Sequence, residues 1–164
     1  MDRQDDTQND GRRDFDFHLG LCRVHNERLA RRLEGCTEWQ EFEATIESQN
    51  VIGGLGNIHF FHAPDHPAGP VEAMGLRFFD PRTRLWSIHW VDNRICQLDP
   101  PVVGRFEGGR GEFLGDDTFA GKPIRVRFIW SDITPTSSRW EQAFSPDGGK
   151  TWETNWRMFL TRQP

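Results

Sequence analysis

The sequence predicts an all-β fold, a sandwich or a barrel, with at most one or two short helices. Two observations lead to this prediction. Glycine and proline (16 and 10 of 164 residues) recur at short intervals and leave little room for long helices. Between these breaks lie short runs rich in aromatic and β-branched residues, several of which alternate apolar and polar side chains as strands do.

Composition indicates a single domain of residues 15–164, preceded by a charged segment, residues 1–14, which we expect to be a mobile polar tail. No apolar run is long enough to span a bilayer, and the N-terminus lacks the apolar core of a signal peptide, so we expect a cytoplasmic protein. A net charge of -5 gives no electrostatic reason to bind nucleic acid or an anionic membrane.

The first part of the domain is ambiguous. Asn26 is a suitable cap for a short helix over residues 26–34, in which Leu29 and Leu33 would stack one turn apart. Residues 38–47 instead favour a strand, because Phe42 and Ile46 fall on one phase of an alternating pattern.

The remaining strands are predicted by alternation between turn signals. They span residues 57–61, 75–79, 85–91, 102–106, 123–130, 139–145 and 151–160. Four of them place their apolar residues on one face, which predicts the wall of a single core. This wall includes Trp86, Ile88, Trp90, Ile124, Val126, Phe128, Trp130, Trp140, Gln142, Phe144, Trp152, Thr154, Trp156, Met158 and Leu160.

Three glycine- or proline-containing segments are interpreted as hairpin turns: residues 80–86, 108–111 and 145–152. The last has the pattern Ser-x-Asp-x-Gly-x-Thr-Trp, which resembles the Asp-box of sialidase propellers. A sialidase would need several such boxes and a tyrosine nucleophile, whereas this chain has one box and no Tyr. Asp147 is therefore expected to accept hydrogen bonds within the turn.

A wider resemblance covers about residues 15–162. It rests on the runs FDFHLG (15–20), GGLGNI (53–58), WSIHW (86–90), RFIW (127–130), WEQAFS (140–145) and WETNW (152–156). In these the chain resembles a bacterial family of calycin-like barrels of unknown function. The resemblance implies an up-and-down antiparallel β-barrel related to lipocalins and fatty-acid-binding proteins.

The chain departs from calycins at the position of the tryptophan that closes their barrel floor. Calycins commonly begin with Gly-x-Trp, and here Gly20 and Leu21 are followed by Cys22. Either the floor is less plugged, or another tryptophan fills it with Arg157 or Arg162 as its partner.

The aromatic face suggests a ligand site if it lines the lumen. The candidate ligand-binding residues are Trp86, Trp90, Phe128, Trp130, Trp140, Gln142, Thr154 and Trp156. Such a lining suits a flat, apolar or aromatic molecule held by one or two hydrogen bonds. The alternative is that the rings simply fill the barrel.

The opposite face carries His89, Arg127, Glu141 and Asn155. A solvated ion pair between Arg127 and Glu141 is one interpretation. If this set instead faces inward or into an interface, it forms a charged site in which His89 is the natural base.

Histidines and cysteines offer few metal sites. His59, His62 and His66 are spaced as zinc ligands on a helix would be, but Pro64 and Pro67 forbid a helix there. The three cysteines (Cys22, Cys36 and Cys96) are odd in number and widely spaced, so we expect reduced, mostly buried thiols. No cofactor is predicted; haem is an alternative that would need His59, His62 or His89 as axial ligand.

Three functional hypotheses follow. The first is a binding protein for a small hydrophobic or aromatic molecule. The second is a cyclase, isomerase or lyase that uses the cavity, with His59 or His89 as acid or base and Arg127 or Glu141 as electrostatic partner. The third is a filled barrel that acts as a homodimeric interaction protein.

Overall fold

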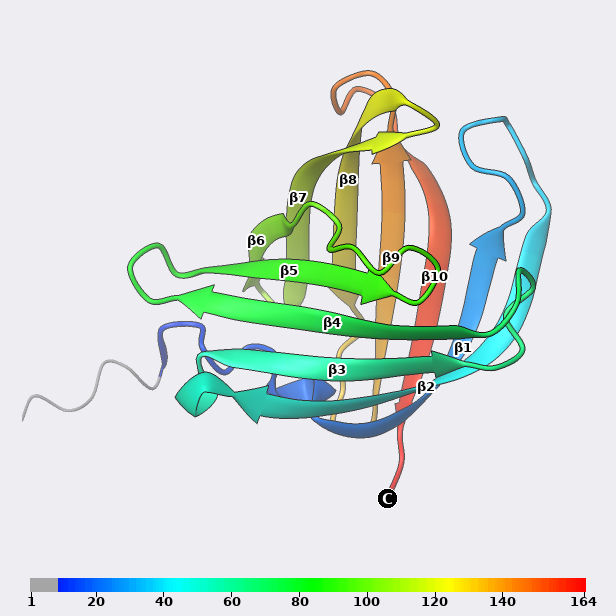
Figure 1. The fold of residues 1–164 in the computed structure, drawn as a ribbon. Coiled ribbons are helices and arrows are strands. Elements are labelled where there is room, and N and C mark those ends of the chain that lie inside the picture. The colour runs from blue at the N-terminus through cyan, green and yellow to red at the C-terminus, as the bar shows by residue number, and fades with distance from the viewer. Residues whose placement is uncertain (1–8) are drawn as a thin grey trace, which may run out of the picture.

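The computed structural model describes residues 9–164, which form a closed antiparallel barrel of ten strands (Figure 1). The all-β prediction is confirmed, because the described residues hold no helix beyond two short 3-10 turns, η2 (Asp16–His18) and η3 (Ile52–Gly54). The strands are β1 (Gly20–Leu29), β2 (Trp39–Val51), β3 (Gly56–Ala63), β4 (Val71–Asp80), β5 (Leu85–Asp92), β6 (Val102–Glu107), β7 (Arg110–Phe119), β8 (Lys122–Ser131), β9 (Ser137–Ser145) and β10 (Glu153–Arg162). Across residues 9–164 no helix is long and apolar enough to cross a membrane.

The barrel is an up-and-down meander in which each strand pairs with the next and β10 pairs with β1. The closing register runs from Cys22 opposite Arg162 to Arg28 opposite Trp156. In Figure 1, β3–β5 run roughly horizontally, whereas β7–β10 run roughly vertically. This change in strand direction is expected for a strongly twisted sheet. Closure gives each of the ten described strands a hydrogen-bonded neighbour on both sides.

Six of the seven predicted runs lie wholly in strands, and residues 39–47 lie in β2. The last run begins two residues too early, because β10 starts at Glu153; Trp152 is therefore not part of the predicted wall and stacks instead on Arg127. The short helix over residues 26–34 is wrong, because Asn26 to Leu29 form the end of β1 and pair with Phe42 to Trp39. Strand β1 was not predicted, and neither was strand β7. Its inward positions include Gly111, Gly115 and Asp117, so it lacks the apolar alternation on which the prediction depends.

The predicted turns are confirmed. Asp80 pairs with Leu85 across the β4–β5 turn, and Glu107 pairs with Arg110 across Gly108–Gly109. In the Asp-box turn, Asp147 Oδ1 accepts hydrogen bonds from the backbone N–H groups of Lys150 and Thr151 at 3.1 and 2.9 Å.

The floor of the barrel is closed by Phe15, just before η2. Its ring packs edge-on against Trp86 and Phe106, with centroids 5.0 and 4.9 Å away. The expected tryptophan plug is therefore replaced by a phenylalanine. The arginine stacked on it is Arg77 of β4, 4.8 Å from the ring centroid, rather than Arg157 or Arg162.

The predicted polar tail is described only from residue 9. In this part Gly11 contacts the barrel, since its carbonyl oxygen accepts a hydrogen bond from the Trp86 indole N–H at 3.0 Å. Residues 1–8 lie outside the described residues.

The cysteines are free thiols. Cys22 is buried, as expected, but Cys36 is half-buried and Cys96 is exposed. The expectation that most of them are buried is wrong, because Cys36 and Cys96 lie in connections between strands rather than on a core phase.

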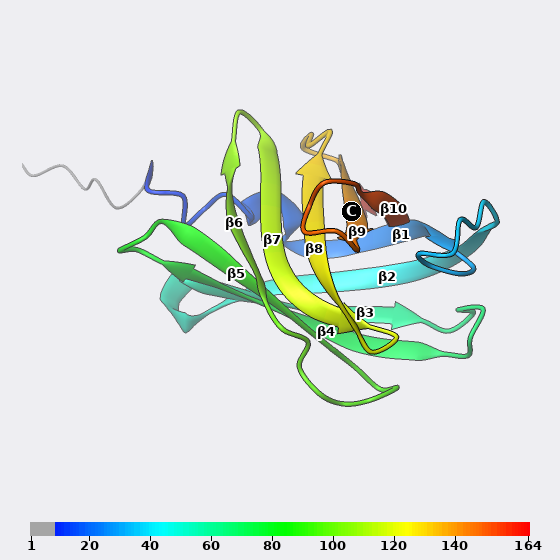
Figure 2. The same ribbon diagram turned by 90° about the horizontal axis from the view of Figure 1, so that it is seen from above.

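The β5–β6 junction is short. It comprises three residue pairs, from Trp86 opposite Gly104 to Ile88 opposite Val102, whereas β1 and β2 share ten. Beyond Ile88 the strands separate, and the connecting loop is joined to β5 by a hydrogen bond from Asp99 N–H to the Trp90 carbonyl at 2.9 Å. Figure 2 shows this connection looping out from the barrel.

Candidate functional site

The lumen contains a cavity of about 280 Å³, so the barrel is not filled. This volume is close to the lower end of the range of about 300–1,000 Å³ that is typical of ligand pockets. Six predicted residues line it: Trp90, Phe128, Trp130, Trp140, Gln142 and Trp156. Trp86 is buried but lies below the cavity, against Phe15 and Phe79.

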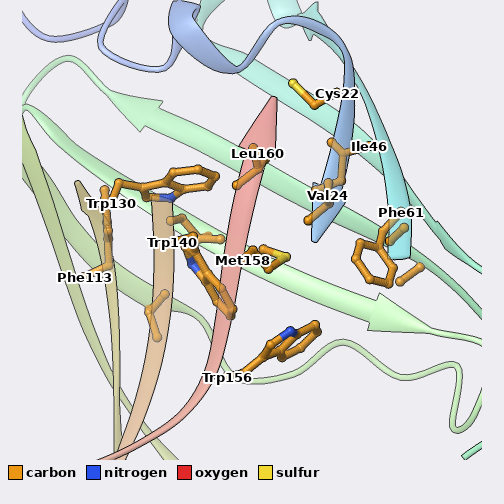
Figure 3. Packing of buried hydrophobic residues seen from close by; sticks show 14 of the residues in the cluster. Cys22, Val24, Ile46, Phe61, Phe113, Trp130, Trp140, Trp156, Met158 and Leu160 are labelled. Atoms are coloured by element: carbon orange, nitrogen blue, oxygen red, sulfur yellow. The ribbon is translucent and has the colours of Figure 1, made fainter. Parts of the chain in front are cut away.

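The aromatic wall is rigid because its rings pack edge to face. Trp140 lies 5.2 Å from Trp156 and 4.9 Å from Phe128 between centroids, and Trp90 lies 5.9 Å from Trp156. The Trp156 indole N–H donates to the Oδ1 atom of buried Asn26 at 3.0 Å. Figure 3 shows the indoles of Trp130, Trp140 and Trp156 pointing into the interior.

Thr154 is absent from this wall. A β-bulge between Thr154 and Trp156 makes Asn155 an extra residue, so Thr154 is opposite Ala143 and Trp156 is opposite Gln142. The one-residue shift turns Thr154 away from the lumen. Asn155 becomes fully buried instead, and its Oδ1 accepts a hydrogen bond from Gln142 Nε2 at 2.9 Å.

A buried polar cluster lies at the deep end of the cavity. Arg77 of β4 is 2% exposed and donates to Asn57 Oδ1 and to His59 Nδ1, both at 2.9 Å. His18 of η2 completes the cluster, with its Nε2 atom 3.1 Å from His59 Nδ1. Trp130 lies beside this cluster, with its ring centroid 5.9 Å from the guanidinium carbon of Arg77.

Burial and the adjacent guanidinium hold the pKa values of His18 and His59 well below the ordinary value. Both imidazoles are therefore neutral at pH 7. Because Arg77 can only donate, His59 Nδ1 is an acceptor and the His59 proton resides on Nε2. Burial also lowers the pKa of Arg77 to about 9, which still leaves it protonated at pH 7.

Gly75 makes room for this imidazole. A Cβ atom built on Gly75 would lie 2.5 Å from His59 Nε2 and 2.6 Å from Cε1, which is closer than side chains tolerate. His59 thus packs against bare backbone of β4, the strand that also carries Arg77. His59 was predicted as a site residue, but Arg77 was not. The signal was present, because Val71, Ala73, Gly75, Arg77 and Phe79 share one alternating phase.

The mouth of the cavity is lined by three further arginines. Arg28 lies over the Trp156 ring at 5.3 Å and contacts His66 Nε2 at 3.1 Å. Arg32 lies over Phe119 at 4.9 Å, and Arg94 pairs with Asp92 at 2.6 Å. Burial and the neighbouring Arg32 and Arg94 lower the pKa of Arg28 to about 10.

The other predicted catalytic residues are not buried in the lumen: Arg127 and Glu141 are absent from the cavity lining, and His89 lies at its border. His89 borders the cavity, but its ring packs against exposed Phe78 with centroids 5.8 Å apart. The Arg127 guanidinium stacks on Trp152 at 4.3 Å. The expected pair of Arg127 with Glu141 is not formed, because Arg127 is opposite Ala143 and Glu141 instead contacts Arg139 at 3.0 Å.

The three histidines of the zinc hypothesis separate in space. His59 faces the lumen, and His62 lies on the outer face, where it contacts Glu72 at 2.5 Å. As a haem ligand His59 is poorly suited, since its Nδ1 lone pair accepts from Arg77 and its Nε2 carries the proton. Metal-ligating groups do gather outside, at His25, Glu27 and Glu41, whose ligand atoms lie within 4.8 Å of one another.

No family model matches the chain, and no curated protein matches it. Among solved structures it is similar to the S-type phycobiliprotein lyase CPES from Guillardia theta, with 9% identity and a TM-score of 0.57 over 92% of this chain and 90% of the other. It is also similar to a redesigned β-barrel, with 12% identity and a TM-score of 0.50 over 93% and 96% of the two chains. At these identities the likeness shows the fold alone, which is a closed antiparallel β-barrel.

Proposed function

We propose that the protein binds a small hydrophobic or aromatic molecule in the barrel lumen. The observation that carries the proposal is the cavity of about 280 Å³ lined by aromatic side chains, among them Trp90, Phe128, Trp140 and Trp156. Edge-to-face rings expose flat apolar surfaces at fixed positions, which favours flat ligands over flexible chains. The volume suits a compact ligand of one or two rings.

A cavity-filling substitution tests the proposal. Val126 is 7% exposed and lines the cavity, so Val126→Phe occupies ligand space. Val103, 41% exposed, provides the matched control Val103→Phe on the outside of the barrel. Binding of a neutral aromatic probe, 1-naphthylacetamide, is followed by quenching of tryptophan fluorescence and by the shift in Tm.

We expect the unmodified protein and Val103→Phe to bind the probe, and folded Val126→Phe to bind it at least about tenfold more weakly, a loss of about 1.4 kcal/mol. Equal binding by all three proteins would place the probe outside the lumen and refute the proposal. Circular dichroism and the urea midpoint establish that both variants are folded.

The enzymatic hypothesis now depends on His59, because His59 is buried in the lumen, whereas His89 only borders the cavity and packs its ring against exposed Phe78. Its Nδ1 lone pair is occupied by the hydrogen bond from Arg77. The ring therefore offers an N–H donor rather than a free base, which suits holding a ligand oxygen better than removing a proton. This chemistry favours binding over proton transfer.

A further inference from the structure

We propose that the ligand is an aromatic carboxylic acid whose carboxylate lies at the deep end of the cavity, against Arg77, His59 and Trp130. The inference rests on the proposed binding function and names its ligand class. It is carried by an unbalanced charge and by an unbalanced set of hydrogen-bond donors.

The charge imbalance lies at Arg77. Among residues 9–164 no Asp or Glu forms an ion pair with its guanidinium, although the side chain is fully buried. Its hydrogen-bond acceptors, Asn57 Oδ1 and His59 Nδ1, are both neutral. A buried cation without a counter-ion is costly, so an anion in the adjacent cavity would be strongly favoured.

Hydrogen-bond donors also outnumber acceptors at this end of the cavity. Three buried donor atoms on residues that line the cavity lack an acceptor within the described residues: Arg77 Nε, His59 Nε2 and Trp130 Nε1. The assignment of the His59 proton to Nε2 follows from the hydrogen bond that Arg77 donates to Nδ1. A carboxylate supplies acceptors only, from two oxygens, and therefore complements this set.

The arginines at the mouth have a different role. Arg28 and Arg32 lie over the rings of Trp156 and Phe119, and both are partly open to water. Solvent screens them more than it screens Arg77, so they attract an acid toward the opening without fixing its carboxylate. The aromatic body of the ligand then occupies the space between the two ends.

The test compares two probes of the same shape, 1-naphthylacetate and 1-naphthylacetamide, which differ in charge at pH 7. We expect the acid to bind at least about tenfold more tightly, equivalent to about 1.4 kcal/mol. Arg77→Met should abolish this preference, so that acid and amide bind with about equal affinity. The matched control, Arg127→Met on the outer face, should keep the preference.

Trp130→Phe provides a second variant in case Arg77→Met does not fold. It retains a ring and removes the unpaired N–H, so the preference for the acid should fall while amide binding persists. Trp152→Phe, on the outer face beside Arg127, is its control. On the unmodified protein, ¹³C NMR of carboxyl-labelled 1-naphthylacetate should show a bound carboxylate that stays ionised below the pKa of the free acid.

The outcomes separate the two proposals. Equal affinity for acid and amide overturns the carboxylate assignment and leaves the binding function intact. Loss of the acid preference in Arg28→Met but not in Arg77→Met also overturns it, because the carboxylate then lies at the mouth. Binding of neither probe overturns both.

Discussion

Lowering the pH should destabilise the fold through His18 and His59, the two histidines of the buried polar cluster. Burial and the neighbouring Arg77 hold the pKa values of His18 and His59 well below their ordinary value of 6.5. Below pH 6.5 these two histidines take up protons in the unfolded chain that they do not bind in the folded protein. Stability is therefore complete above pH 6.5 and is lost progressively as the pH falls toward the lowered pKa values.

The magnitude follows from the burial and contacts of the cluster. Protonating His59 would place a second cation beside Arg77, at a cost of about 4 kcal/mol for charges about 4 Å apart at an effective dielectric constant of about 20. While the folded imidazole stays neutral, each histidine contributes a slope of about 1.4 kcal/mol per pH unit. Between pH 7 and pH 5 each should remove about 2 kcal/mol from the free energy of unfolding.

Urea denaturation at pH 7 and pH 5 measures this loss. His59→Gln is the informative variant, because a glutamine amide oxygen can accept the Arg77 hydrogen bond but does not titrate. Its stability should fall by about 2 kcal/mol less than that of the unmodified protein over this interval. His62→Gln, on the outer face of the same strand, is the matched control for the substitution itself. An identical pH dependence in His59→Gln would refute the neutral, buried imidazole.

Three further outcomes are expected. Gly104→Ala should destabilise the protein by about 2 kcal/mol or more in urea, because its Cβ would lie 1.8 Å from the backbone oxygen of Glu112; an unchanged midpoint would show that β6 and β7 can separate freely. Asn26→Leu should cost about 1–3 kcal/mol by leaving the Trp156 indole N–H unpaired, and a neutral result would mean that water satisfies this donor. Asp147→Ala should lower the Tm without changing probe affinity, since Asp147 holds a turn remote from the lumen; a change in affinity would contradict that separation.

Alternation predicted the aromatic wall because apolar side chains report burial directly. Trp86, Trp90 and Trp140 lie on the inward phase to which the sequence assigns them. The prediction that Thr154 faces the lumen was wrong for a physical reason. A bulge inserts one residue without changing the local composition, so the alternation shifts by one residue with no sign of it in the sequence. Period-two analysis is therefore reliable only as far as the next bulge.

The polar cluster was harder to predict because burial of charge depends on partners distant in sequence. His18, His59 and Arg77 lie on three different elements and meet only when the barrel closes. Arg77 shares a phase with apolar neighbours, but a single arginine on such a phase is usually solvated. The distinction required the closed topology, which brings Phe15 beneath its guanidinium.

The three-pair junction between β5 and β6 has a kinetic consequence. A barrel opens most readily where its hydrogen-bond ladder is shortest, and Trp90 and Asp99 at this junction flank the cavity. Backbone amides near the junction should exchange with deuterium faster than those of the ten-pair β1–β2 ladder. The rates at which a ligand enters and leaves the lumen would then be set by transient opening of the β5–β6 junction. Its affinity would be set by the residues that line the cavity.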